Sequence, residues 1–348
     1  MGDMVTFAAA SPAAGASFLL RQQARDRLRT AGLLATAEQI VARRAELSPA
    51  VAAANVTRES ARAVGLADSR FGFVLRLENS AAFGAAIGAG VTGRSDGSSL
   101  TVPARANALV TLLDGLLDDA AGLDTSAVRA ASTVLFDLAD GGEPACRVET
   151  LVGQVAVDLA RQVRQDLQAG PGFAKPELRE MLQEEVALAL RSELATTERP
   201  DDLEVWRGKS AHAAAACALA AVTMKSGLSA RDARQVRDLM REAGSLVGWL
   251  DDLTDFEEDL LSGNGSEVVC ILQAMLPAGV PALAAAAAVG TTVVRRAIDM
   301  GTQSRIATTL GCLESLPAAR RPGARLLLRD ACTMAGGFAS GSARMSVT

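Results

Sequence analysis

The acids that decide the fold stand in one stretch, Leu250-Asp251-Asp252-Leu253-Thr254-Asp255-Phe256-Glu257-Glu258-Asp259. Asp251, Asp255 and Asp259 recur at every fourth position, which on a helix places them in a stripe about 80° wide over two turns. Like charges at this spacing repel one another and destabilise a helix. A hard divalent cation is the simplest partner that offsets this repulsion, because Mg²⁺ prefers carboxylate oxygens as ligands. The stretch therefore predicts a helix with a metal-binding face.

A second acidic stretch lies upstream and reads Leu112-Leu113-Asp114-Gly115-Leu116-Leu117-Asp118-Asp119. We expect it at the end of a long helix that Pro103 opens. Asp114 and Asp118 lie about 40° apart on such a helix, and the flanking leucines indicate that part of this acidic edge faces packed structure. Two acidic stripes facing each other across a bundle would hold a Mg²⁺ cluster and grip a diphosphate, so that a carbon–oxygen bond can ionise. The alternative is a pair of acidic helix ends that face solvent.

A cationic element lies between the two acidic stretches, Trp206-Arg207-Gly208-Lys209-Ser210. Small residues follow it, and these permit close helix packing. Arg207 and Lys209 are candidates to contact phosphate oxygens, Arg207 as a fork and Lys209 as a point charge. The alternative for them is a pair of surface bases at the start of a helix.

The composition favours an all-α protein. Of the 348 residues 49% are hydrophobic, aromatic residues make up 3%, and tyrosine does not occur. Much of the apolar share is alanine, the strongest helix former, whereas strands prefer β-branched and aromatic residues. We expect a single bundle of about ten or more helices around a central cavity. Its expected limits are residues 21–336, with a flexible leader over 1–20 and a flexible tail over 337–348.

Charge and cysteine content narrow the functional classes. The formal net charge of −5 argues against a chain whose whole surface serves nucleic acid, and we expect no nucleic-acid partner. The five cysteines are dispersed and His212 is the only histidine, so neither a zinc site nor a disulfide framework is indicated. The longest uncharged stretches do not have the pattern of a transmembrane segment. The start of the chain does not have that of a signal peptide, which makes the cytoplasm the expected location.

Between Ala104 and Val269 the chain resembles the class I isoprenoid synthase superfamily, which includes polyprenyl diphosphate synthases, squalene and phytoene synthases and terpene cyclases. Lys209-Ser210 is similar to the Lys-Thr helix of the polyprenyl synthases, and the stretch 244–255 is similar to their second Asp-Asp-x-x-Asp helix. Asp114-x-x-x-Asp118 takes the place of the first aspartate-rich motif. There, Gly115 stands where that motif has its second aspartate, and Asp119 is the candidate to compensate.

The resemblance implies an all-α isoprenoid synthase fold and a set of site residues. About three Mg²⁺ ions would bind the diphosphate of an allylic substrate. Arg207, Lys209 and Trp249 would contact the substrate, and Arg207 would join the aspartates in catalysis. The residues implied as metal ligands are Asp114, Asp118, Asp119, Asp251, Asp252, Asp255 and Asp259. A homodimer is also implied.

The departures from the family pattern indicate the reaction. The first motif has no Arg-Arg-Gly after it and no Gly-Gly-Lys-Arg before it, so the residues that hold a second, homoallylic diphosphate in chain-elongating relatives are missing. We therefore expect a terpene synthase that cyclises or rearranges one allylic diphosphate. Two alternatives remain: a prenyltransferase of the elongating or head-to-head type, and a non-catalytic helical subunit of a prenyl synthase.

Two further features of a cyclase have candidates in this sequence. Without tyrosine, the Arg-Tyr pair of the cyclases is absent, and Arg325 or Arg329 would supply only its charge. The cavity of a cyclase also needs aromatic faces that stabilise a carbocation. The candidates for these faces are Phe71, Phe73, Phe83, Phe136 and Trp249.

Overall fold

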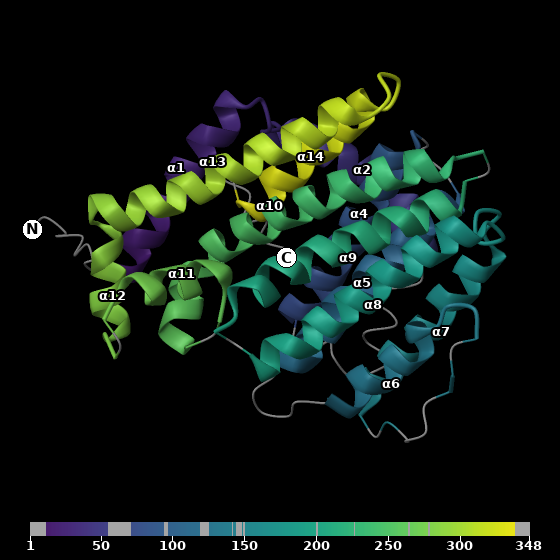
Figure 1. The fold of residues 1–348 in the computed structure, drawn as a ribbon, viewed down its shortest axis with the longest axis horizontal. Helices are drawn as coiled ribbons and strands as arrows, with labels where there is room; N and C mark the ends of the chain where they lie inside the picture. The colour runs from purple at the N-terminus through teal and green to yellow at the C-terminus, as the bar shows by residue number, and fades with distance from the viewer. Residues whose placement is uncertain are drawn as a thin grey trace, which may run out of the picture.

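The computed structural model describes residues 12–54, 71–93, 97–118, 125–140, 142–143, 148, 150–199, 201–225, 227–263, 265–277 and 279–337. Within these ranges the regular structure is entirely helical (Figure 1), which confirms the predicted fold class. The helices are α1 (Pro12–Thr30), α2 (Ala37–Ala53), α4 (Phe71–Thr92), α5 (Ser98–Asp118), α6 (Thr125–Phe136), α7 (Leu151–Ala169), α8 (Pro176–Glu198), α9 (Leu203–Thr223), α10 (Ala230–Ser262), α11 (Glu267–Met275), α12 (Ala282–Val289), α13 (Thr292–Ser315) and α14 (Arg321–Ala335).

Capping residues set the ends of α9 and α10, the two helices that carry the cationic element and the longer acidic stretch. Asp202 caps α9 and accepts a hydrogen bond from the Glu204 amide. Ser229 and Asp232 form a capping box at the start of α10, and Gly263 ends it with φ +76°, a conformation that glycine adopts without strain.

The prediction for α5 is wrong at its start. Gly97, whose carbonyl accepts the first amide bonds, starts the helix at Ser98, so Pro103 lies inside it.

Helix α9 is the central element of the bundle and packs against α4, α5, α8 and α10. Its middle is almost entirely alanine and is buried. A Cβ atom placed at Gly244 of α10 would lie 2.8 Å from the Ala214 Cβ, and a Cβ at Gly248 would lie 2.7 Å from the Ser210 Cβ. Glycines therefore let α10 approach α9 closely, and this closeness brings the acids of α10 next to the bases of α9.

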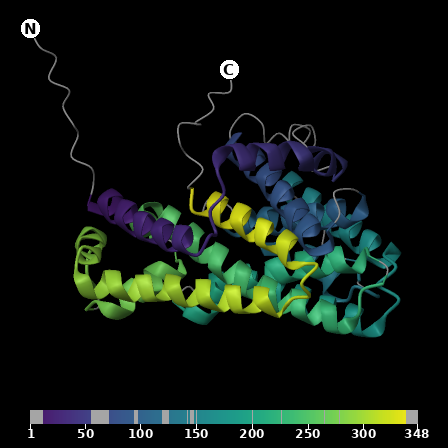
Figure 2. The ribbon, with the colours of Figure 1, turned by 90° about the horizontal axis from the view of Figure 1, so that it is seen from above.

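The first helix corrects the predicted domain limits. α1 begins at Pro12, inside the expected leader, and Ala13, Ala16 and Leu20 are buried. It packs against α10, α12 and α13, as Figure 2 shows from above. Apolar burial of this helix is the reason that the leader is shorter than expected. Residues 1–11 and 338–348, the remainder of the expected leader and nearly all of the expected tail, lie outside the described residues.

One described helix has the length and apolar composition of a membrane span. It comprises Ser98–Leu117 of α5, and 61% of it is buried inside the protein. Because α5 packs against α4, α7 and α9, its apolar character is accounted for by its place in the core of the bundle.

Candidate active site

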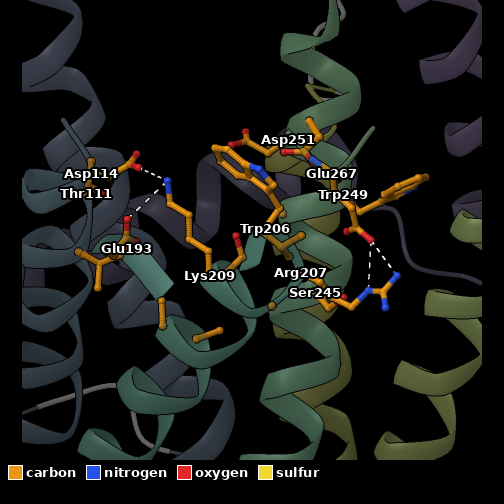
Figure 3. A pocket seen from close by; sticks show the side chains of 18 of the residues that line it. Thr111, Asp114, Glu193, Trp206, Arg207, Lys209, Ser245, Trp249, Asp251 and Glu267 are labelled. Carbon is orange, nitrogen blue, oxygen red and sulfur yellow. Dashed lines mark hydrogen bonds and ion pairs between the residues drawn. The ribbon is translucent and has the colours of Figure 1, made fainter. Parts of the chain in front are cut away.

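A cavity of about 220 Å³ lies between α5, α8, α9 and α10, with the start of α11 at its edge. Its lining includes residues of both acidic helices and of the cationic element (Figure 3). The predicted site residues that it brings together are Asp114, Arg207, Lys209, Trp249, Asp251 and Asp252. Residues as far apart in sequence as Phe83 and Glu267 thus share one space, and both acidic helices border it.

The α5 side of the cavity is balanced by an internal cation. The Lys209 ammonium forms an ion pair with Asp114 and lies 3.5 Å from Glu193 Oε2 on α8. The ammonium also lies 5.5 Å from the centre of the Trp206 ring. In Figure 3 Lys209 extends from α9 toward both carboxylates. Asp114 therefore meets a positive charge that the protein itself supplies.

The α10 side carries carboxylates in excess. Burial, reinforced by the neighbouring Asp251 carboxylate, holds the pKa of Asp252 well above its usual range, although its Oδ2 accepts a 2.8 Å hydrogen bond from the Glu267 amide. Burial likewise raises the pKa of Asp259 to about 7; Asp255 and Asp251 add to this and a hydrogen bond with Ser266 opposes it.

The stripe on α10 divides into two faces. Asp252 and Asp259 are seven residues apart, which is about 20° around a helix, and both contact the first residues of the α11 segment. Asp251 is exposed at the cavity and Asp255 is half-buried. Neither Asp255 nor Asp259 lines the cavity as the structure describes it, since both lie further along α10.

A second polar group joins the cavity to α13. Arg207 donates to Glu267 through Nε at 3.2 Å and pairs with Glu204 at 2.8 Å. Glu267 also pairs with Arg305, whose guanidinium lies 4.2 Å from the centre of the Trp249 ring. Trp249 is buried, and its Nε1 donates to Thr302 Oγ1 at 2.9 Å. Arg207, like Lys209, thus faces the cavity while paired with carboxylates.

Three charged residues at this site, Glu193, Glu267 and Arg305, were not predicted from the sequence. Glu193 follows Val186 by seven residues and Leu190 by three, so it occupies a position of the apolar stripe of α8. A charged residue in a core register was the available signal for it. Glu267 and Arg305 meet across 38 residues, and no local pattern indicates their pairing.

Several other candidates lie elsewhere. Asp119 and the side chain of Asp118 lie outside what the structure describes, as do the side chains of Phe71 and Phe73. Phe83 lines the cavity, whereas Phe136 is an exposed residue outside it. Arg329 donates to the Leu34 carbonyl at 3.1 Å and to Gln39 at 2.8 Å, so its charge is directed toward the first turn of α2 and the residues before it. Arg325 does not line the cavity either.

The donor set of α10 fits a magnesium ion. All of its acids offer oxygen ligands, and burial together with neighbouring carboxylates raises the pKa values of Asp252 and Asp259, a shift that a nearby positive charge would oppose. A divalent cation would supply that charge. Among the described residues, however, no three acidic, histidine or cysteine side chains already converge as a finished metal site.

Comparison with solved structures identifies the fold. A polyprenyl synthase from Roseobacter denitrificans aligns with a TM-score of 0.55 and 15% identity over 86% of this chain and 99% of its own. A linalool/nerolidol synthase from Streptomyces clavuligerus, solved with 2-fluorogeranyl diphosphate, aligns with a TM-score of 0.50 and 14% identity over 87% and 94%. The chain therefore has an isoprenoid synthase-like fold, as its motifs predicted.

No protein-family model matches the chain, and a search of curated proteins finds no match.

Proposed function

We propose that this protein is a class I terpene synthase that ionises one linear allylic prenyl diphosphate and releases diphosphate. The observation that carries the proposal is one cavity, within an isoprenoid synthase-like fold, that is lined both by carboxylates of α10 and by Arg207 and Lys209. An acidic wall and a basic element around one space suit a polyanion held through divalent cations.

The residues of the chain have distinct roles in this proposal. Asp251, Asp252, Asp255 and Asp259 would hold Mg²⁺, which when bound neutralises the charge that develops on the leaving diphosphate. Arg207 and Lys209 orient the diphosphate by donating hydrogen bonds to its oxygens. Phe83 gives the cavity aromatic surface without a nucleophile, which suits a carbocation, whereas the Trp249 ring is buried toward α13 beside Arg305. Asp114, Asp118 and Asp119 as metal ligands stay predictions, as do the homodimer and the cytoplasmic location.

An apolar pocket next to the cavity suits the hydrocarbon part of such a substrate. Val110 lines both spaces, and the pocket extends between α5, α7, α8 and α9 among Leu113, Leu190 and Cys217. Its volume is about 50 Å³. Because burial of apolar surface drives binding, this pocket would contribute affinity without chemistry.

A prenyltransferase is the second candidate, since one of the two solved structures described above is a polyprenyl synthase. The deciding experiment incubates the protein with C10 to C25 allylic diphosphates and Mg²⁺, with and without isopentenyl diphosphate, and identifies the products by mass. Products of unchanged carbon number support the terpene synthase. Longer products that require isopentenyl diphosphate, or two joined allylic chains, indicate the prenyltransferase. No diphosphate release from any substrate would indicate a non-catalytic subunit.

A further inference from the structure

The Lys209 ammonium is positioned unlike those of the other two lysines. Lys175 donates to the Leu228 carbonyl at 2.9 Å and Lys225 to the Thr92 carbonyl at 2.6 Å, both backbone partners. Lys209 instead lies between two carboxylates that come from different helices, Asp114 of α5 and Glu193 of α8. Two acid side chains that converge on one cation are the arrangement in which a divalent ion is also commonly held.

Burial makes this cluster costly to leave unbalanced. The exposed fractions of the side chains are 4% for Glu193, 17% for Lys209 and 27% for Asp114. Removing one partner of a buried ion pair leaves an uncompensated charge, which is strongly destabilising. The Trp206 ring, 5.5 Å from the ammonium, adds a cation–π contact on a further side. The ammonium is thus held by groups of α5, α8 and α9 together.

We propose that the Lys209 ammonium is a built-in cation that takes the place of one divalent ion between Asp114 and Glu193. This inference rests on the proposed function and changes its metal chemistry: in the substrate-free protein, divalent ions bind at the α10 acids and not at α5. A second cation is disfavoured at the α5 side while the ammonium is there, because two positive charges would repel each other in a partly buried space. Glu193, outside both acidic stretches, thereby becomes a residue of the site.

The tether gives the ammonium an advantage over a free ion. Mg²⁺ gives up its water reluctantly, whereas Lys209 is joined to α9 and is present at the cluster at any metal concentration. Its ammonium has three N–H donors and lines the cavity in which a diphosphate would lie. One residue can therefore balance α5 and contact substrate.

Counting bound Mn²⁺ without substrate tests the proposal, with free Mn²⁺ measured by electron paramagnetic resonance. Lys209→Gln is expected to bind one ion more than the wild-type protein, because Asp114 and Glu193 then lack their cation. The double variant Lys209→Gln/Glu193→Gln is expected to lose that gain. Lys175→Gln is the matched control and should bind as many ions as the wild type. An unchanged count in Lys209→Gln, or a gain that persists in the double variant, would overturn the proposal.

A second measurement needs no variant and so does not depend on whether Lys209→Gln folds. The Lys209 amine of the wild type is acylated with and without Mn²⁺, and its modification is followed by mass spectrometry with Lys175 as reference. We expect equal modification in both conditions, whereas faster modification with Mn²⁺ would show that metal displaces the ammonium. Neither measurement uses a prenyl substrate, so their failure is distinct from a failure of the product assay.

Discussion

Asp114 on α5 and Asp252 on α10 line the same cavity, yet their surroundings differ in sign. Asp114 pairs with the Lys209 ammonium, whereas Asp252 has Asp251 and Glu267 as charged neighbours. Lys209 therefore supplies a cation directly to Asp114, whereas Asp252 is left beside a surplus of negative charge, although Arg207 and Arg305 pair with Glu267. In a solvent-poor space that surplus raises the pKa of the acids unless a cation joins them.

This difference shows which side gains more from a metal ion. On α10 a divalent cation would relieve repulsion among several acids, and at the α5 side it would have to compete with an ammonium already in place. Two aspartate stretches that look equivalent in sequence are thus unequal in the fold.

The largest effect is expected from the acid that faces the cavity on the surplus side. Asp251→Asn keeps the shape of the side chain and removes one charged ligand, so we expect kcat/KM for Mg²⁺-dependent diphosphate release to fall about 10²- to 10³-fold, as on loss of one preorganised electrostatic group. Asp238→Asn is the matched control, because Asp238 lies on the same helix, is exposed and pairs with Arg237. Full turnover by Asp251→Asn would show that the α10 acids hold no catalytic metal.

The sequence predicts the two acidic helices, because helix positions depend on local patterns. The spacing of four residues predicts that Asp251 and Asp255 lie on one face of a helix, and Ser229, a capping residue, predicts where that helix starts. The fold class followed from the alanine content, and the shared cavity followed from the two acidic stretches taken together.

The different charge surroundings of the α5 and α10 acids could not be predicted from the sequence, because they depend on pairing between residues far apart in the chain. Lys209 and Asp114 are 95 residues apart, and Glu193 joins them from a third helix. A pattern along one helix records which face is acidic and does not record which base reaches it. The prediction of a leader over residues 1–20 failed for a similar reason. The burial of Ala13 and Leu20 depends on helices more than 200 residues downstream.

A buried acid outside the cavity allows the effect of burial on a pKa to be measured apart from any effect of a metal ion. Asp330 on α14 is 2% exposed; burial raises its pKa to about 6 while Arg43 and Arg329 oppose the shift. The folded protein then binds more protons here than the unfolded chain, so stability falls as pH rises from about 4 to 6, by at most about 3 kcal/mol for a shift of about two units.

Asp330→Asn should abolish that fall and leave the protein more stable than the wild type above about pH 6. Urea unfolding at several pH values measures it, and the same curves with Mg²⁺ are the control, since Asp330 does not line the cavity. Parallel pH profiles of the two proteins would contradict the expectation.

The spacing of the two sides depends on the close contact between α9 and α10. Gly244→Ala places a methyl group against the Ser210 carbonyl and the Ala214 side chain, and we expect a loss of about 1–3 kcal/mol from overpacking. Activity should fall too, because Arg207 moves away from Asp251 while Lys209 keeps its contact with Asp114.

Gly311→Ala is the matched control for this change. Gly311 lies in α13 with open space around it, so alanine there should raise stability by about 0.5–1 kcal/mol through its higher helix propensity. Thermal unfolding distinguishes the two variants. Equal shifts in Tm would mean that the α9–α10 contact does not set the geometry of the cavity.

The smallest effect concerns the aromatic support of the built-in cation. The Lys209 ammonium lies 5.5 Å from the Trp206 ring, and the Arg305 guanidinium lies 4.2 Å from the buried Trp249 ring, so each side of the cavity has one cation–π contact. Because Trp206 is only half-buried, its contact is expected to be worth about 0.5–1 kcal/mol. A double-mutant cycle of Trp206→Leu and Lys209→Gln in urea unfolding measures this coupling directly. Zero coupling would mean that the ring contributes nothing and that only the ion pairs with Asp114 and Glu193 stabilise the ammonium. The α5 side would then differ from the α10 side in lacking an effective cation–π contact.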